Sequence, residues 1–333
     1  MIISHAVRNA ISPAIIFVIL MPLLFIAGCT SDGNTPPDVR EVPGQEGWGI
    51  YELDRSTLDV KLLYGSSYEI FTSCLGLSSS GDRLVFAQKI GGQDNDNMEI
   101  CSIGTDGGDF TRITNNRFWD LYPVWSPDDT RLAFLSMREN DLDIYVIDAD
   151  GGNEHKLFDS GFHDADIDWV GDSIVFTSQS AIWRMNPDGT QPVEITSPPG
   201  RGEWGIANLP LGDYDPRLSP DGGRIVFERL DDVNQPNGIY NIYVINRDGS
   251  GETRLTDTGY AQGLVNWSHS GRELVYIVGA INGEGKYDIY IMNSDGTGNH
   301  NITPDYFPAD FLCRAALFSQ DDSKILFIGQ WWE

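Results

Sequence analysis

One short phrase recurs along this chain of 333 residues and limits the possible folds more than any other feature. Its fullest form runs from Trp125 to Phe134 and joins a Ser-Pro-Asp turn to an Arg and an apolar run. The six copies begin at Leu77, Trp125, Trp169, Leu218, Trp267 and Phe318, at steps of 48, 44, 49, 49 and 51 residues. A period of this length is typical of a solenoid or a propeller, in which each repeat is one supersecondary unit.

Each unit predicts four short strands, named A to D. Strand A ends at the first residue of the phrase, and strand B is the Arg-x-x-Phe run that follows the turn. Strand C is an apolar run such as residues 143–148, and an Asp-Gly turn leads into the short strand D. Asp and Gly suit that turn because both tolerate a positive φ. No window shows a helical period, so the units are interpreted as blades of a β-propeller.

The two ends of the chain complete each other. The sixth copy has a strand B at residues 324–328, but the sequence stops at Glu333 before a strand C. Residues 50–54 match the strand C pattern, and residues 60–64 match strand D. We therefore predict an all-β fold, a six-bladed β-propeller of four-stranded antiparallel blades over residues 48–333. N-terminal strands should close its last blade and so leave no open edge.

These phrases resemble the WD40-like repeat of the TolB β-propeller family. The resemblance covers residues 48–333 and is strongest in the second, fourth and fifth units. TolB itself carries an α/β domain before its propeller and is a soluble periplasmic protein. In this sequence an acidic tether and a lipidation signal occupy that position.

The first residues predict export and a lipid anchor. Arg8 precedes an apolar run that ends in Ile26-Ala27-Gly28-Cys29, which resembles the bacterial lipobox. We expect residues 1–28 to be a lipoprotein signal peptide, Cys29 to be lipidated, and residues 29–47 to be a flexible tether. The protein would then sit in the cell envelope, at the outer membrane or its periplasmic side, with membrane contact through the lipid alone. An ordinary signal peptide or membrane anchor with a chance cysteine is the alternative.

The charge balance restricts the partners. Asp and Glu number 49 against 22 Lys and Arg, which gives a formal charge of −27. Such a field repels phosphate backbones, so nucleic-acid binding is not expected. Partners should be neutral or basic, or bridged by a cation. We expect a monomer, and a saline habitat would explain the acidity equally well.

Loop lengths favour one face of the propeller. The A–B and C–D turns are short and similar, and they share one face, named the A–B/C–D face. The B–C and D–A loops share the other, the B–C/D–A face, and vary most, as at residues 89–98, 197–212 and 230–238. Because loops that vary on a rigid scaffold commonly carry function, we predict that the B–C/D–A face binds an envelope protein or peptide.

Aspartates gather where strand A begins. Strand A is the innermost strand, so residues five and three positions before its end should surround the channel mouth. The aspartates at these positions are Asp120, Asp164, Asp166, Asp213 and Asp215. Close carboxylates repel unless a cation compensates, which predicts a socket for a basic segment or a Ca²⁺ site, with Asp166 and Asp215 its best candidates. The alternative is that each Asp accepts local backbone hydrogen bonds.

Aromatic residues on the loops suggest anchors for a partner. Trp119, Trp204 and Phe307 lie outside the repeated register and are the candidates. A bulky apolar residue also recurs seven positions before the end of each strand A, which we interpret as packing between blades.

The phosphate-loop, G-x-S-x-G and H-E-x-x-H motifs are missing, so no enzymatic activity is expected. The alternative is a metal-dependent polysaccharide lyase or hydrolase on a propeller, with His163 near its site.

Overall fold

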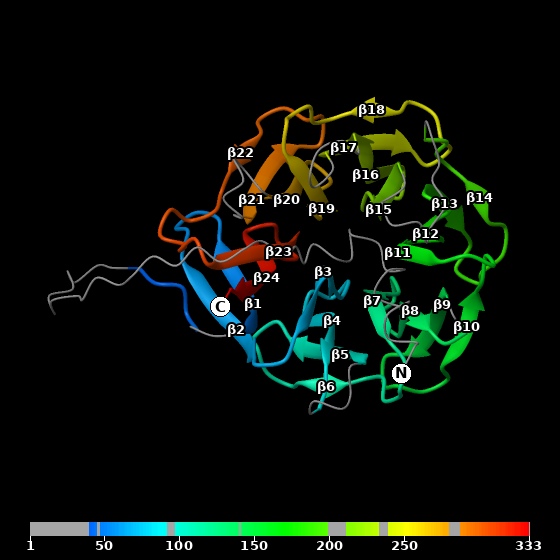
Figure 1. Cartoon of the computed structure of the whole chain (residues 1–333), viewed down its shortest axis with the longest axis horizontal. Coiled ribbons are helices and arrows are strands. Elements are labelled where there is room, and N and C mark those ends of the chain that lie inside the picture. Colours follow the sequence, from blue (N-terminus) through cyan, green and yellow to red (C-terminus); the bar gives the residue numbers. More distant parts are fainter. Residues whose placement is uncertain are drawn as a thin grey trace, which may run out of the picture.

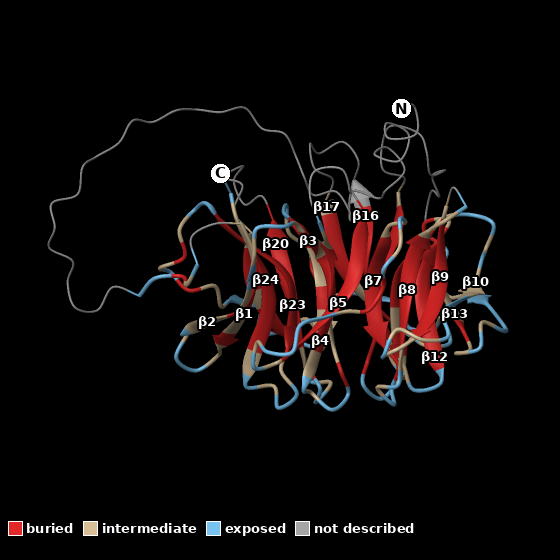
Figure 2. Ribbon diagram, turned by 90° about the horizontal axis from the view of Figure 1, so that it is seen from below, coloured by how far each residue is buried: buried red, intermediate tan, exposed pale blue. Residues whose placement is uncertain are grey.

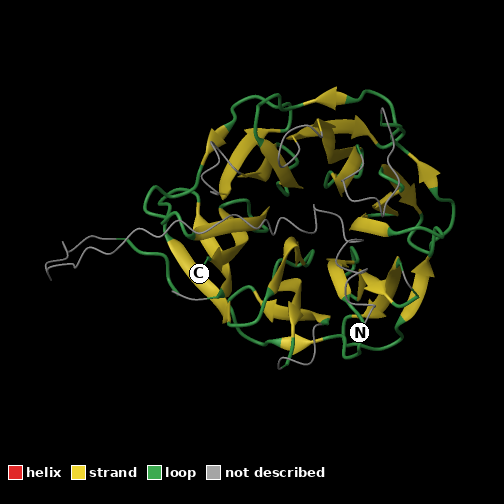
Figure 3. Ribbon diagram, viewed as in Figure 1, coloured by secondary structure: helices red, strands yellow, loops and turns green. Residues whose placement is uncertain are grey.

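The computed structural model describes residues 40–44, 47–91, 97–139, 141–198, 211–232, 239–279 and 287–332. These ranges form 24 strands and no helix (Figure 3). The strands make six four-stranded antiparallel sheets arranged around a central axis (Figure 1). The predicted six-bladed β-propeller is therefore confirmed. Within the same ranges, no helix has the length and apolar character that crossing a bilayer requires.

Each blade follows the predicted order from the inner strand A to the outer strand D. Blade 1 comprises β3 (Ile70–Leu77), β4 (Arg83–Lys89), β5 (Met98–Gly104) and β6 (Thr111–Arg112). Blade 2 comprises β7 (Asp120–Trp125), β8 (Arg131–Met137), β9 (Leu142–Asp148) and β10 (His155–Phe158). Blade 3 comprises β11 (Asp164–Val170), β12 (Ser173–Ser178), β13 (Ala181–Met185) and β14 (Val193–Glu194). Blade 4 comprises β15 (Gly212–Leu218), β16 (Arg224–Asp232), β17 (Ile239–Asn246) and β18 (Thr253–Arg254). Blade 5 comprises β19 (Ala261–Trp267), β20 (Glu273–Gly279), β21 (Tyr287–Asn293) and β22 (His300–Asn301). Blade 6 comprises β23 (Phe311–Phe318), β24 (Lys324–Trp331), β1 (Trp48–Asp54) and β2 (Val60–Ser66).

The sixth blade joins the two ends of the chain, as predicted. In Figure 1 the blue strands β1 and β2 lie beside the red strands β23 and β24. Strand β1 pairs with β24 over its whole length, with Ile50 opposite Ile328. The Tyr51 ring stacks on Phe327 at 5.4 Å between centroids and meets the edge of Phe311 at 5.2 Å. Hydrogen bonds and apolar packing therefore close the ring together.

The repeated phrase forms the core because its apolar residues face the neighbouring blades. The aromatic residue of the Arg-x-x-Phe run is fully buried in every blade, from Phe86 in blade 1 to Phe327 in blade 6. In four blades it pairs across the sheet with the Tyr of strand C, as Phe134 does with Tyr145. Figure 2 shows these buried strands in red, with exposed turns along the lower edge. Blades buried on both faces explain why strands B and C are apolar almost throughout.

Candidate functional site

A β-bulge interrupts the inner strand of every blade at the same place. The residue three positions before the end of strand A lies inside this bulge, and the six residues form what we call the bulge ring. Its members are Cys74, Tyr122, Asp166, Asp215, Leu264 and Ala315. All except Cys74 have a positive φ, between 31° and 55°. Asp tolerates this left-handed conformation, whereas Tyr122 and Leu264 each store on the order of 1–2 kcal/mol of strain.

Three acidic side chains meet inside the channel at the bulge ring. Asp166 Oδ2 accepts a hydrogen bond from Asp215 N at 3.3 Å, and Glu228 of β16 accepts one from Leu264 N. All three side chains are at least 96% buried. Burial raises the pKa of Asp166, and burial with the charges of Asp166 and Glu228 raises the pKa of Asp215 well above its ordinary value. Burial raises the pKa of Glu228 to about 8. Burial therefore favours the protonated form of all three carboxyl groups in this channel cluster.

This cluster meets part of what a Ca²⁺ site requires. Among the described residues, Asp166 Oδ1 and both carboxylate oxygens of Asp215 are buried without a hydrogen-bond partner, so a cation would satisfy them. Ca²⁺ takes six to eight oxygen ligands, and two carboxylates alone do not supply that number. Arg217 also lies close enough to lower the pKa of both aspartates. Calcium binding at Asp166 and Asp215 stays a prediction.

Another acidic group lies at the outer side of blade 2. The carboxylate oxygens of Glu139, Asp143 and Asp159 are close enough together to hold a metal ion. However, Lys156 Nζ already lies 2.8 to 3.1 Å from all three carboxylates. The lysine thus provides the positive charge that a cation would otherwise bring, and we interpret the group as an ion-pair network.

The other three predicted aspartates do not meet at the channel mouth. Asp120, Asp164 and Asp213 are fully buried and bind groups of their own blade or of the loop before it. Ser136 Oγ donates to Asp120 at 2.5 Å, Ser160 Oγ donates to Asp164 at 2.6 Å, and Arg229 donates to both oxygens of Asp213 at 2.6 and 2.9 Å. These carboxylates hold the start of strand A, so their contacts agree better with the structural alternative than with a shared binding surface.

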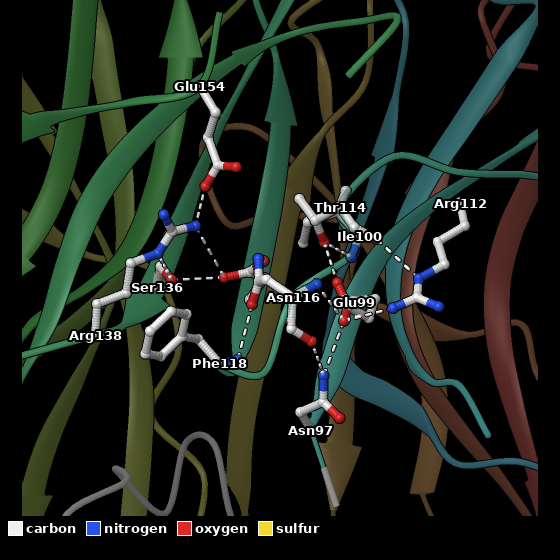
Figure 4. Close-up of polar contacts among 11 residues, drawn as sticks. Asn97, Glu99, Ile100, Arg112, Thr114, Asn116, Phe118, Ser136, Arg138 and Glu154 are labelled. Atoms are coloured by element: carbon white, nitrogen blue, oxygen red, sulfur yellow. Dashed lines mark hydrogen bonds and ion pairs between the residues drawn. The ribbon is translucent and has the colours of Figure 1, made fainter. Parts of the chain in front are cut away.

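Asp120 belongs to a larger polar network that joins blades 1 and 2 (Figure 4). At its centre the fully buried Glu99 accepts hydrogen bonds from Asn97, Arg112, Thr114 and the backbone of Asn116, at 2.7 to 3.0 Å. Asn116 then donates to Asp120 at 2.7 Å and accepts from Phe118 N at 2.8 Å. The network therefore fixes the D–A loop that carries Phe118 and Trp119.

The three predicted aromatic anchors differ in how far the structure supports them. Phe307 is 4% exposed and packs on Phe311 at 5.1 Å, so it is a core residue and offers no surface to a partner. Trp119 is half-buried against the core, and Trp204 lies outside the described residues. The prediction failed for Phe307 because it follows strand D, where the chain turns inward to cover the last blade.

Other aromatic residues are exposed on the B–C/D–A face. Tyr68, Phe162 and Tyr260 lie in three D–A loops and are 47, 53 and 36% exposed. Trp332 follows β24 at the same face and is 47% exposed. Phe162 and Tyr260 belong to the series seven positions before the end of strand A. The recurrence of an apolar residue at this position predicts packing between blades, whereas the structure leaves Phe162 and Tyr260 exposed.

His163 is fixed beside this face. Its Nδ1 accepts a hydrogen bond from Leu142 N at 3.0 Å, and burial lowers the pKa of its imidazole. A neutral ring held by the backbone explains this histidine without catalysis.

Comparisons with known proteins agree with the fold. No protein-family model matches the chain. An uncharacterized protein of Agrobacterium fabrum is 28% identical over 182 residues, which are 51% of this chain and 58% of that protein. A TolB homolog of Chlorobium luteolum is 27% identical over 179 residues, 52% of this chain and 36% of that protein. The matches thus span about half or less of these relatives.

A solved structure matches over a longer stretch. The putative TolB of Agrobacterium tumefaciens superposes with a TM-score of 0.64 at 16% identity, over 87% of this chain and 100% of that one. The chain is thus a TolB-like six-bladed β-propeller with distant TolB homologues.

Proposed function

We propose that this protein is a non-enzymatic lipoprotein of the cell envelope that binds a neutral or basic protein or peptide through its B–C/D–A face. The observation that supports this proposal most directly is the set of exposed aromatic side chains on that face, Tyr68, Phe162, Tyr260 and Trp332. Large apolar residues exposed together on one face are typical of interaction sites, and aromatic residues often dominate binding energy. The similarity to TolB proteins supports a location in the envelope.

The electrostatics favour the same class of partner. The formal charge of −27 attracts basic segments and speeds their association. The buried carboxyl cluster lies in the channel beneath the aromatic loops. A cationic side chain that entered from this face would meet unpaired oxygens of Asp166 and Asp215.

Alanine variants of the loop aromatics test the binding face. Replacement of Tyr68, Phe162 and Tyr260 together should reduce capture of the specific partner from envelope extract about tenfold or more, because each anchor contributes roughly 1–2 kcal/mol. Phe110→Ala is the matched control, since Phe110 is 45% exposed but lies before β6, near the C–D turn. The readout is quantitative mass spectrometry of the captured proteins. Equal capture by the triple variant and the wild type would exclude this face.

The anchor has a separate test. Cys29→Ser should abolish labelling by a palmitate analogue and move the protein from the membrane fraction to the soluble fraction. The reason is that acyl chains supply the membrane affinity, at about 0.8 kcal/mol for each buried CH₂. Cys101→Ser is the control, because this buried thiol is not available for acylation. A Cys29→Ser protein that remains lipid-labelled contradicts the proposal.

A further inference from the structure

A funnel opens at the centre of the A–B/C–D face, opposite the proposed partner face. Its volume is about 300 Å³, ten times that of a cavity of about 30 Å³ beside Asp215 and Glu228 near the other mouth. The last two residues of strand A from all six blades line the funnel. They include Trp125, Trp169 and Trp267. A pocket of this size lies at the lower end of the range for small-ligand sites.

The funnel has one polar wall and one apolar wall. Asp168, Arg217 and Asn266 occupy equivalent positions in blades 3, 4 and 5 and form the polar wall. The equivalent positions in blades 6, 1 and 2 are Leu317, Gly76 and Val124. The repeat would allow any of these residues at each position, yet the polar groups cluster on consecutive blades. One side of the funnel is therefore polar and the opposite side is apolar.

Hydrogen bonds hold the guanidinium of Arg217 in place. Its Nε donates to Asn266 Oδ1 at 3.2 Å, and its Nη1 donates to the carbonyls of Ile167 and Pro216 at 3.3 and 3.0 Å. These bonds leave Nη2 without a partner in the described part of the chain. A donor fixed this firmly loses little entropy when a ligand accepts its hydrogen bond.

Asp168 supplies a fixed acceptor on the same wall. Its Oδ2 accepts a hydrogen bond from Leu218 N at 2.7 Å, and no side chain among the described residues donates a hydrogen bond to Oδ1. No ion pair within 4.0 Å joins Asp168 to Arg217 among the described residues, although both line the funnel. The same wall of the funnel therefore carries a carboxylate and a guanidinium that are not joined by a direct ion pair.

This arrangement matches a ligand group that has a hydrogen-bond acceptor and a hydrogen-bond donor side by side. We propose that the funnel binds a small uncharged ligand through a secondary amide, whose carbonyl accepts from Arg217 Nη2 and whose N–H donates to Asp168 Oδ1. The alkyl part of the amide lies against Leu317 and Val124. An anion would be repelled by Asp168 and a cation by Arg217, so the wall selects a neutral group. Acetamido sugars and N-acylated amino-acid amides share this chemistry.

Tryptophan fluorescence of the full chain can test the proposal, because three tryptophans line the funnel. N-acetylglucosamine and N-acetylalanine methylamide are the two amide probes, and glucose and acetate are the probes without an amide. We expect saturable binding of at least one amide probe with a Kd on the order of 1 mM. The probe that binds identifies the source of the amide, and binding by both supports the shared chemistry.

Asp168→Asn should weaken that binding about tenfold, because an amide oxygen can keep the bond to Leu218 N while its NH₂ faces the ligand N–H. Asp150→Asn is the matched control, in an exposed C–D turn of the same face.

The comparison of amide probes with glucose uses the wild type alone, so it remains decisive if the variant does not fold. Amide probes that bind no better than glucose, or undiminished binding by a folded Asp168→Asn protein, would overturn the proposal. Variants of Tyr68, Phe162 and Tyr260 should bind the probes normally, which separates this site from the partner face.

Discussion

A chain that begins at residue 67 should lose cooperative unfolding, whereas a chain that begins at residue 40 should melt like the full protein. The shorter chain lacks β1 and β2, and β24 then loses all seven paired positions with β1. It also loses the buried side chains of Ile50, Tyr51 and Leu53. Each contributes roughly 2–5 kcal/mol, and their sum is comparable with the whole stability of a domain, about 5–15 kcal/mol.

Calorimetry and circular dichroism of the two truncated chains measure this effect. Tyr51→Ala provides a milder version, with an expected loss of about 3–5 kcal/mol from its contacts with Phe311 and Phe327. A synthetic peptide of residues 47–66 should restore cooperative melting to the chain that begins at residue 67. If that chain melts cooperatively at the full protein's Tm without the peptide, ring closure does not stabilise the propeller.

Glu228→Gln should stabilise the protein at pH 8 by a few kcal/mol and have little effect at pH 4.5. The pKa of this carboxyl rises from its ordinary value of 4.5 to about 8 in the folded state. The unfolded chain therefore releases the proton first, and wild-type stability falls as pH rises from 4.5 towards 8. A neutral Gln removes this loss, and its carbonyl can still accept the hydrogen bond from Leu264 N.

Urea denaturation at several pH values between 4.5 and 8 measures the difference. The free energy of unfolding of the wild type should decline across this range, and that of Glu228→Gln should decline less. Glu41→Gln, at an exposed position outside the strands, is the control and should follow the wild type. Parallel curves for the wild type and Glu228→Gln would show that this carboxyl is not protonated in the folded protein at neutral pH.

In the channel, regular strand periodicity predicts the wrong arrangement of the aspartates. Regular alternation places residues five and three positions before the end of strand A on the same side, so Asp164 and Asp166 were expected to share the channel mouth. The bulge shifts the register between Ala165 and Asp168 and breaks that alternation. Asp166 therefore enters the carboxyl cluster, while Asp164 binds Ser160 of its own loop.

Glu228 and Arg217 were missed for a related reason. Neither belongs to a motif, since Glu228 follows the Arg-x-x-Phe run on strand B and Arg217 precedes the end of strand A. Their contacts link different blades, as from Arg217 to Asn266 and from Leu264 to Glu228. A close Gly assists the second contact, because a Cβ on Gly263 would lie 2.5 Å from the Glu228 carboxylate.

The sequence by itself determined the number of blades, the four strands of each blade and the closure of the ring by both chain ends. Those features follow from local turn chemistry and from apolar patterns that repeat about every 48 residues. Only the tertiary structure decided which aspartates share the channel, which aromatic residues stay exposed and where the funnel lies. These depend on side chains from different blades and on a bulge without a sequence signature, because contacts between blades join residues about 50 positions apart.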